Sequence, residues 1–424
     1  MLGICELQTL IVADSDDYWL SRLHIATILS VSILLTIGAS NTSPAQHSQT
    51  IATAAVHKPS NVHNTSTADL SYDTQNMTHR SAKAEWQPHR AQTTTSQEWW
   101  YFTALLHDAS GNRYMLFSTI FKYDGKDVPI VKGAPEFAPK LGPNATIISP
   151  IVKLSNYDTG FHTFNSDAAI VDPKAIWNSK SNTLSYTTPQ YTGSWSFNGQ
   201  NLTAVLKSPK MSFDLNMQGG NQVMWAKDAA FNKEGFLQQA IPGNVSFYYS
   251  LPRLIISGKL SYTNESGTNK TIDVVGQGWV DRQWGDFKTQ AWEWASFRFD
   301  NGARVNLYSF ENAHKVGTYQ KPDGSLQWLD NFTVRQNGYD KAPSGQWVSS
   351  GWGYDFPINV EGSMHYTVIP FSNNDWICSP PTFCFIEGAG QLIDGMTGKH
   401  LGSSINESMD IRILKNGPYD VNQH

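Results

Sequence analysis

The sequence contains little cysteine, little charge and few of the motifs that mark metal chemistry. Only three cysteines occur among its 424 residues, and charged residues make up 16% of the chain. The formal net charge of −5 provides no basic surface, which excludes nucleic acid as a partner. The twelve histidines show neither the HxH nor the HExxH spacing of metal sites, so no metal is expected.

Motifs for phosphate binding and covalent catalysis are missing as well. Gly276-x-Gly278 is followed by a strand pattern and by no Lys-Ser/Thr pair, so it is not a phosphate-binding loop. No GxSxG nucleophile elbow occurs, and neither Cys378 nor Cys384 has the setting of a single catalytic cysteine. We therefore expect a protein that works without a cofactor.

The N-terminus predicts a route into the secretory pathway. Residues 25–39 are apolar, follow Arg22 and His24, and precede small and polar residues, as the central region of a signal peptide does. This run is short for a membrane span, which needs about 20 residues. Residues 1–40 are therefore predicted to be a signal peptide, and the protein to be secreted. Because residues 14–17 are acidic, an uncleaved membrane anchor and a later start codon remain alternatives.

Two further features agree with an extracellular protein. Residues 41–92 are rich in Ser, Thr and Asn and nearly free of bulky apolar side chains, which predicts a disordered linker. Cys5 would leave with the signal peptide, whereas Cys378 and Cys384 bracket a short loop and are expected to form a disulfide, with two free thiols as the alternative. Sequons for N-glycosylation occur at Asn41, Asn64, Asn76, Asn144, Asn201, Asn244, Asn264, Asn269, Asn331 and Asn406.

The remainder of the chain, from residue 93, has the pattern of an all-β protein. Residues 98–107 and 113–123 are strand-like and flank a turn rich in Gly, Asn and Asp. Residues 292–299 and 303–310 flank Asp300-Asn301-Gly302, which is a strong hairpin signal. No stretch shows a long apolar period of 3.6 residues, so few helices are expected. Many short strands with regular turns indicate a sandwich or a barrel.

A weak internal repeat predicts two related halves. Glu98-Trp99 opens a strand that is followed by a turn and by Arg-x-x-Leu-aromatic-Ser from Arg113. Glu293-Trp294 opens another strand, followed by a turn and the same pattern from Arg304. We therefore expect two β-domains, residues 93–243 and residues 244–424.

Three segments together resemble a known family. They are EWWYF at residues 98–102, YYSLPRL at residues 248–254 and GQGWVDRQWGD at residues 276–286. Their order and spacing are similar to those of the AttH-like family of bacterial secreted proteins and its relative carotenoid 1,2-hydratase (hydroxyneurosporene synthase). Fungal members of the wider group include kievitone hydratase and lipocalin-like Diels–Alderases. The resemblance implies an all-β fold of two lipocalin-like β-barrel domains that enclose a hydrophobic cavity; it transfers fold better than reaction.

The hydratases of this group add water to a prenyl-type double bond, which is a weak base and needs a carboxylic acid that is still protonated. A carboxyl among Trp rings meets this need because desolvation raises its pKa, and the rings can stabilise a cation. Asp281 lies in the most specific segment, near Trp279 and Trp284 in sequence. We expect it to be the general acid, provided that alternation along the strand turns Arg282 away. An ordinary ion pair between Asp281 and Arg282 is the alternative.

Further residues complete the expected site. Glu98 and Glu293 are reserve catalytic carboxyls, although Glu98 equally suits a buried partner for an arginine. The expected substrate-binding residues are Trp99, Trp100, Tyr101, Trp279, Trp284, Trp292, Trp294 and Tyr308. We expect a hydratase or dehydratase that acts on a lipophilic terpenoid, polyketide or prenylated phenolic. A Diels–Alderase-type pericyclase, a non-catalytic lipocalin-like carrier and a carbohydrate-active protein remain alternatives.

Overall fold

The computed structural model describes residues 81–89, 97–124, 146–172, 174–228, 233–238, 245–286, 292–310, 314–341, 347–379 and 383–409. The expected signal peptide, Cys5 and the sequons at Asn41, Asn64, Asn76, Asn144 and Asn244 lie outside these residues, as does most of the expected linker. The linker prediction is wrong for residues 81–89, because Trp86 is fully buried in the core of the first sheet. Within the described ranges, no helix is long and apolar enough to cross a membrane.

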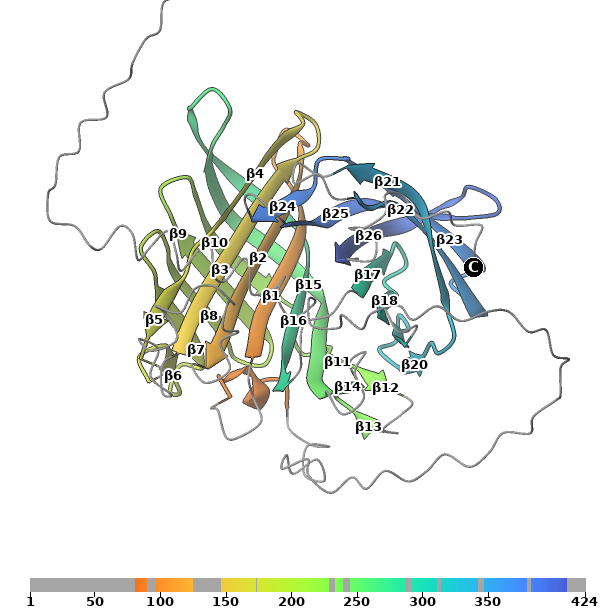
Figure 1. Ribbon diagram of the computed structural model, residues 1–424, viewed down its shortest axis with the longest axis horizontal. Coiled ribbons are helices and arrows are strands. Elements are labelled where there is room, and N and C mark those ends of the chain that lie inside the picture. The colour runs from red at the N-terminus through yellow and green to blue at the C-terminus, as the bar shows by residue number, and fades with distance from the viewer. Residues whose placement is uncertain are drawn as a thin grey trace, which may run out of the picture.

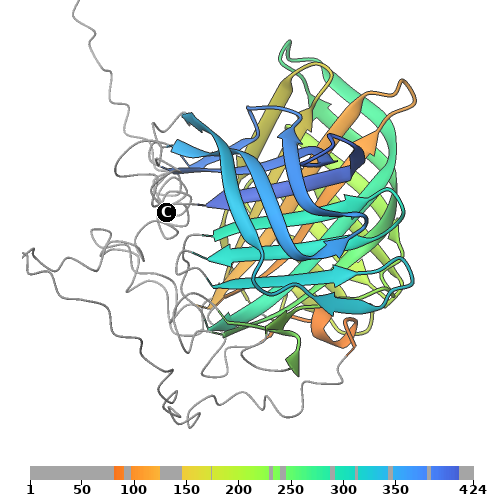
Figure 2. The same ribbon diagram turned by 90° about the vertical axis from the view of Figure 1, so that its right-hand side faces the viewer.

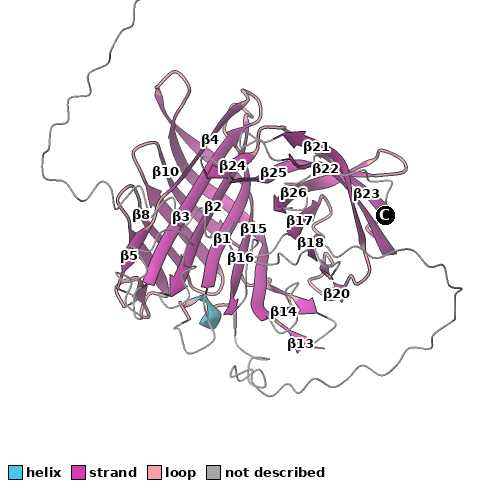
Figure 3. Ribbon diagram, viewed as in Figure 1, coloured by secondary structure: helices cyan, strands magenta, loops and turns pink. Residues whose placement is uncertain are grey.

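The described residues form strands almost throughout (Figure 3). The first sheet and the segment before it contain η2 (a 3₁₀ helix, Ala84–Trp86), β1 (Gln97–His107), β2 (Arg113–Asp124), β3 (Thr146–Asn156), β4 (Phe161–Ser166), β5 (Ala169–Val171), β6 (Trp177–Asn178), β7 (Thr183–Thr187), β8 (Thr192–Phe197), β9 (Asn201–Lys207), β10 (Met211–Gln218), β11 (Met224–Trp225), β12 (Lys227–Asp228), β13 (Lys233–Glu234), β14 (Phe236–Gln238), β15 (Val245–Thr263) and β16 (Asn269–Asp286). The second sheet contains β17 (Trp292–Phe299), β18 (Arg304–Phe310), β19 (Lys315–Gln320), β20 (Leu326–Trp328), β21 (Thr333–Lys341), β22 (Trp347–Val360), β23 (Ser363–Pro370), β24 (Trp376–Ser379), β25 (Phe383–Asp394) and β26 (His400–Met409).

The two sheets repeat one connectivity, and the all-β expectation with two lipocalin-like barrels is confirmed (Figure 1). In the first sheet the strand order runs β4-β3-β2-β1-β16-β15, so the first strand pairs with the last. In the second sheet it runs β20-β19-β18-β17-β26-β25, which is the same arrangement. The hairpins β1–β2 and β17–β18, which carry the Glu-Trp repeat, therefore occupy equivalent places. The expected division at residue 243 is wrong, because β15 and β16 belong to the first sheet and the change of sheet falls between Asp286 and Trp292.

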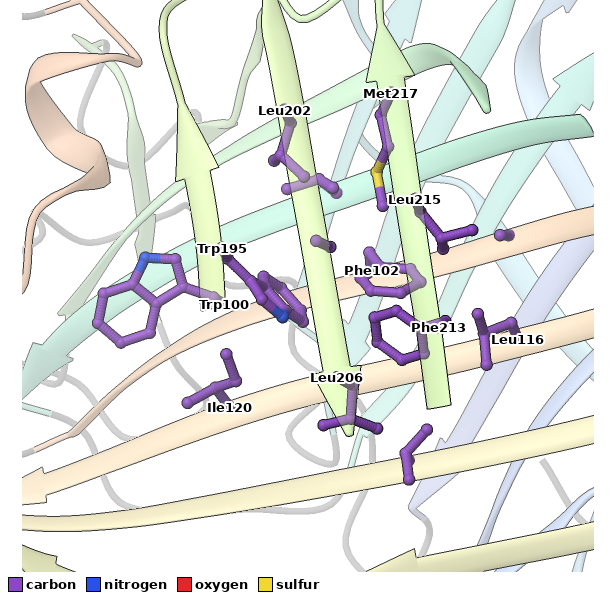
Figure 4. Packing of buried hydrophobic residues seen from close by; sticks show 14 of the residues in the cluster. Trp100, Phe102, Leu116, Ile120, Trp195, Leu202, Leu206, Phe213, Leu215 and Met217 are labelled. Atoms are coloured by element: carbon purple, nitrogen blue, oxygen red, sulfur yellow. The ribbon is translucent and has the colours of Figure 1, made fainter. Parts of the chain in front are cut away.

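The first sheet curls around a core of its own. Strict alternation along β9 and β10 turns Leu202, Leu206, Phe213 and Leu215 inward, and these side chains pack with Phe102 of β1 (Figure 4). Each buried side chain of this size stabilises the fold by about 1.5–3 kcal/mol relative to exposure. The second sheet encloses a separate core of buried apolar residues.

A third apolar cluster joins the outer faces of the two sheets. It contains side chains of both, among them Tyr101 and Trp279 from the first sheet and Trp294 and Ile405 from the second. Figure 2 shows the strands of the second sheet lying across those of the first. The two barrels therefore share a packed apolar interface, and the candidate site lies within it.

The glycine spacing in β16 has a packing explanation. A Cβ atom at Gly276 would lie 2.0 Å from the backbone oxygen of Leu105, and one at Gly278 would lie 2.6 Å from the side chain of Ile256. Glycine at both positions therefore lets β1 and β15 approach β16 closely, which accounts for the Gly-x-Gly pattern without a phosphate.

The sequon at Asn406 is corrected by the structure. Asn406 is fully buried in the second barrel, and its amide donates a hydrogen bond of 2.5 Å to the Tyr354 hydroxyl. A glycan at that nitrogen would break this bond and could not fit inside the barrel. Among the other sequons in the described ranges, Asn201, Asn269 and Asn331 are exposed and Asn264 is half-buried.

The predicted disulfide can be tested by mass mapping. Cys378 and Cys384 are directly paired between β24 and β25. Opposite residues of an antiparallel pair have Cα atoms about 4.5–5.5 Å apart, which suits a disulfide. We expect a peptide linked through both cysteines when the protein is purified without reductant from an oxidising compartment. Alkylation of both thiols under those conditions would contradict it.

Candidate active site between the barrels

A cavity lies between the two sheets. The space within it, including solvent at its open mouth, is about 640 Å³. Strands β1, β2 and β16 of the first sheet and β17, β18, β25 and β26 of the second supply its walls. Its described lining consists of nine aromatic side chains, two carboxyls, one amide and one hydroxyl: Trp99, Tyr101, Phe117, Phe121, Trp292, Trp294, Tyr308, Phe310, Phe385, Asp281, Glu407, Gln283 and Thr119.

Alternation along β16 decides which of its side chains reach the cavity. Asp281 and Gln283 line it, whereas Arg282 points to the opposite face, into the first barrel. Asp281 lies directly opposite Tyr101 of β1, which also lines the cavity. The condition that Arg282 turn away from Asp281 is therefore met.

Asp281 is almost completely shielded from solvent. Its side chain is 3% exposed and accepts a hydrogen bond of 2.7 Å from the indole nitrogen of Trp279. Burial raises the pKa of Asp281 from 3.8 to about 7, although hydrogen bonds from Ser250, Trp279 and Tyr248 and the charge of Arg298 oppose the rise. A large fraction of this carboxyl is therefore protonated at neutral pH, as a general acid requires.

A second carboxyl, Glu407 of β26, faces the same cavity. The indole of Trp292 donates a hydrogen bond of 2.9 Å to it, and Glu387 lies directly opposite on β25. Burial is the main cause that raises the pKa of Glu407 to about 7, with the charge of Asp281 adding to it. Burial and the neighbouring Glu407 raise the pKa of Glu387 well above its ordinary value, and Tyr101 donates a hydrogen bond of 2.8 Å to Glu387.

Neither glutamate of this pair is among the site residues predicted from the sequence. Glu407 lies inside the Asn406-Glu407-Ser408 sequon, and a glycosylation site predicts an exposed position rather than a buried strand. Glu387 is a lone acid in the apolar stretch FCFIEGAG of β25. A carboxylate in an otherwise apolar strand was the available signal, because such a group is rarely buried without a reason. Their pairing across two strands could not be inferred without the register.

Glu98 has a structural role and does not line the cavity. It is fully buried in the first barrel, where it forms ion pairs with Arg282, with Lys122 at 3.0 Å and with His89 at 3.2 Å. Burial raises its pKa, but the charges of Lys122 and Arg282 and the contacts of His89 prevail and hold it far below the ordinary value of 4.5. Glu98 therefore stays ionised near neutral pH. It is the buried partner of an arginine and not a catalytic acid.

Glu293 is also displaced from the cavity. It points into the second barrel and accepts hydrogen bonds from Trp352 at 2.7 Å, Ser349 at 2.8 Å and Ser408 at 3.0 Å. Its neighbours in sequence, Trp292 and Trp294, point the other way and line the cavity. Because successive side chains of a strand point to opposite faces, the Glu293 carboxyl and the indoles of Trp292 and Trp294 lie on opposite faces of β17.

The expected substrate-binding aromatics divide into three groups. Trp99, Tyr101, Trp292, Trp294 and Tyr308 line the cavity. Trp279 lies behind Asp281 and orients it. Trp100 and Trp284 are corrected: both belong to the core of the first barrel, where Trp100 stacks under the Arg282 guanidinium at 3.9 Å and Trp284 stacks on His89.

Comparison with known proteins places the chain in a family. The family model for AttH-like proteins matches residues 82–405. The chain belongs to the AttH-like family. No functionally curated protein sequence matches it.

Solved structures share this AttH-like fold at low identity. An AttH-type protein from Nitrosomonas europaea has a TM-score of 0.58 and 16% identity, with 77% of this chain and 95% of that chain covered. Kievitone hydratase from Nectria haematococca has a TM-score of 0.54 and 14% identity, with 79% of this chain and 94% of that chain covered. At these identities the likeness establishes the fold alone.

Metal ligands do not gather in the described part of this AttH-like protein. Within those residues, no group of three or more His, Cys, Asp or Glu side chains is arranged to hold a metal ion. The carboxyls at the cavity are instead engaged with indole and phenol donors. Asp281 and Glu407 therefore present carboxyls with raised pKa values to a cavity lined by aromatic rings.

The role of Glu98 can be tested by its stability effect. Glu98→Gln leaves Arg282 and Lys122 buried without their anion, so it should reduce the free energy of unfolding by about 3–5 kcal/mol at pH 7. Because the folded pKa is lowered, this stabilisation is present above the ordinary value of 4.5 and is lost as the pH falls below it. Urea denaturation at pH 7 and pH 3 measures both effects, because about 1.4 kcal/mol is lost for each pH unit below 4.5.

The matched control for this experiment is Glu265→Gln, which makes the same chemical change at an exposed hairpin residue. Its unfolding should stay within about 0.5 kcal/mol of the unmodified protein. Equal stability of the Glu98→Gln and Glu265→Gln variants would refute the structural role.

Proposed function

We propose that the protein is a hydro-lyase that adds water to, or removes it from, a lipophilic substrate in the cavity between the barrels. The observation that carries the proposal is the Asp281 carboxyl, which faces an aromatic cavity and has its pKa raised to about 7 by burial. A protonated acid at neutral pH is the group that an unactivated alkene needs.

The steps follow from the cavity's own residues. In the hydration direction, Asp281 transfers its proton to one alkene carbon, and the electron pair of the double bond forms the new C–H bond. The adjacent carbon becomes a cation, which the faces of Trp99, Trp292 and Trp294 stabilise. Water adds to that carbon and loses a proton to the Asp281 or Glu407 carboxylate. Dehydration is the same sequence in reverse.

The carboxyls favour this reaction over the rival functions. A pericyclase or a carrier acts through cavity shape and apolar contact and needs no acid near neutrality. Burying Asp281 and Glu407 costs stability at pH 7, and neither rival explains why the cavity wall keeps both. The similarity in fold to kievitone hydratase, whose name states a hydration, adds support. Terpenoids, polyketides and prenylated phenolics are the substrate classes whose apolar character suits an aromatic enclosure.

Asp281→Asn tests the proposal directly. The amide keeps the shape and can still accept the Trp279 hydrogen bond but cannot donate an acidic proton, so turnover should fall by about 10²–10⁴-fold. With the natural residue, turnover should decline as the pH rises above about 7, because Asp281 then ionises. Untargeted metabolomics of a deletion strain, complemented with each variant, identifies the substrate and product by a mass difference of one water.

The same variant separates catalysis from stability. Because the pKa of Asp281 is raised from 3.8 to about 7, its cost to folding is absent below pH 3.8 and grows as the pH rises to 7. Asp281→Asn should therefore unfold at equal or higher urea concentration at pH 7. A mass-neutral product that Asp281→Asn still forms would favour the pericyclase, and full turnover in the variant would refute the proposed acid.

We also infer that the protein is secreted and glycosylated, since an apolar N-terminal run precedes the sequons and three of these are exposed. Enzymatic removal of N-glycans from protein in the culture medium should lower its apparent mass. Asn331→Gln should remove one glycan, whereas Asn406→Gln should remove none because Asn406 is buried. An unglycosylated protein found only inside the cell would contradict the inference.

A further inference from the structure

We propose that the cavity between the barrels binds hydrophobic organic cations, such as quaternary ammonium compounds, and that their binding displaces a proton from the carboxyls on its wall. The proposal rests on the same cavity as the proposed function, but it concerns which charge the cavity accepts and not which reaction it performs. A stable ammonium ligand would occupy the place of the transient cation.

The aromatic wall is the first observation. Tyr101 and Trp294 meet edge to face with ring centroids 5.6 Å apart, and Trp99 and Phe121 do so at 5.7 Å. All four rings belong to the cavity lining, which contains no Lys or Arg among its described residues. An enclosure of aromatic faces without a competing cation is the arrangement that recognises quaternary ammonium groups.

The carboxyl pair is the second observation. Glu387 and Glu407 lie directly opposite each other on β25 and β26; Glu387 is fully buried, and Glu407 is half-buried at the cavity wall. Opposite residues of an antiparallel pair have Cβ atoms about 4.5–5.5 Å apart, so two ionised carboxylates here would repel strongly. The pair therefore retains at least one proton while the cavity holds no positive charge.

The other charged and titratable groups near the pair do not remove this need. Lys153 of β3 forms its ion pair with Asp375 at 2.8 Å, and although its charge lowers the pKa of Glu387, burial and Glu407 prevail. Arg298 of β17 donates a hydrogen bond of 3.0 Å to Thr103, and although its charge lowers the pKa of Asp281, burial prevails there as well.

The remaining neighbours add acid rather than positive charge. Asp281 of β16 and Glu293 of β17 act on Glu407 by their negative charge and raise its pKa. The phenols of Tyr101 and Tyr308 remain neutral, since burial raises the pKa of each well above its ordinary value. A bound cation adds positive charge on the cavity side of the wall, so Glu407 or Asp281 ionises when the cation binds.

The experiment compares two probes of the same shape, benzyltrimethylammonium and its uncharged isostere neopentylbenzene. Titration calorimetry with the full chain at pH 6, in two buffers of different ionisation enthalpy, measures proton release. We expect up to about one proton per benzyltrimethylammonium and none for neopentylbenzene. The affinity of the cation should rise by up to about tenfold per pH unit between pH 5 and 7 and then level off. The affinity of the neutral probe should not rise.

Variants test whether Glu407 is responsible for cation binding and proton release. Glu407→Gln can still accept the Trp292 hydrogen bond but cannot ionise, so it should weaken cation binding by about tenfold or more at pH 7 and reduce proton release. Its affinity for neopentylbenzene should be unchanged, which shows that the cavity is intact. Glu265→Gln, the exposed control, should leave both probes unaffected. If Glu407→Gln does not fold, the pH series on the unmodified protein still decides.

Each proposal can fail without the other. Equal affinity for both probes at every pH, or heats that do not depend on the buffer, would overturn the cation site even if Asp281→Asn abolishes turnover. Conversely, cation-selective binding with proton release would stand even if Asp281→Asn leaves turnover intact, because neither probe reacts.

Discussion

The two-residue period of β16 is the constraint on which both the fold and the site depend. It sends Arg282 into the first barrel, where the guanidinium meets Glu98 and lies over Trp100, and it sends Asp281 to the outer face toward the second barrel. A slip of one residue in this strand would exchange the two. The buried Arg282–Glu98 pair fixes the register between β1 and β16, since either group left without its partner would be an uncompensated buried charge.

The same pair of strands thus holds two carboxyls whose pKa values are shifted in opposite directions. Glu98 and Asp281 are both buried, but only Glu98 has cations in contact, so burial prevails at Asp281 and the surrounding charges prevail at Glu98. The sheet that separates them is one backbone thick. Asp281, with its raised pKa, can therefore lie close to the ionised Glu98, because Asp281 faces the cavity and Glu98 faces the interior of the first barrel.

The sequence predicted the parts of this protein that depend on local pattern. Alternation and turn residues were enough to anticipate strands throughout, the hairpin at Asp300-Asn301-Gly302, and the opposite orientations of Asp281 and Arg282. The pairing of distant strands was not available. Without it the sequence places the domain boundary at residue 243 and Trp100 and Trp284 in the cavity, and it does not indicate that Glu387 and Glu407 lie side by side. Which face of a strand meets which sheet is a property of long-range register, and a local pattern does not encode it.

The energetic balance of the cavity argues that its carboxyls are retained for what they do. Asp281, Glu387 and Glu407 all have raised pKa values, so each reduces the stability of the folded state as the pH approaches neutrality. Gln or Asn could accept the Trp279 and Trp292 hydrogen bonds without that cost. A purely structural layer between two barrels would be more stable with amides at these positions. What amides cannot provide is a proton to donate and a negative charge that appears when a cation forms. The three carboxyls therefore lower the free energy of unfolding at neutral pH. A reaction or a ligand that places positive charge among the aromatic rings accounts for their presence.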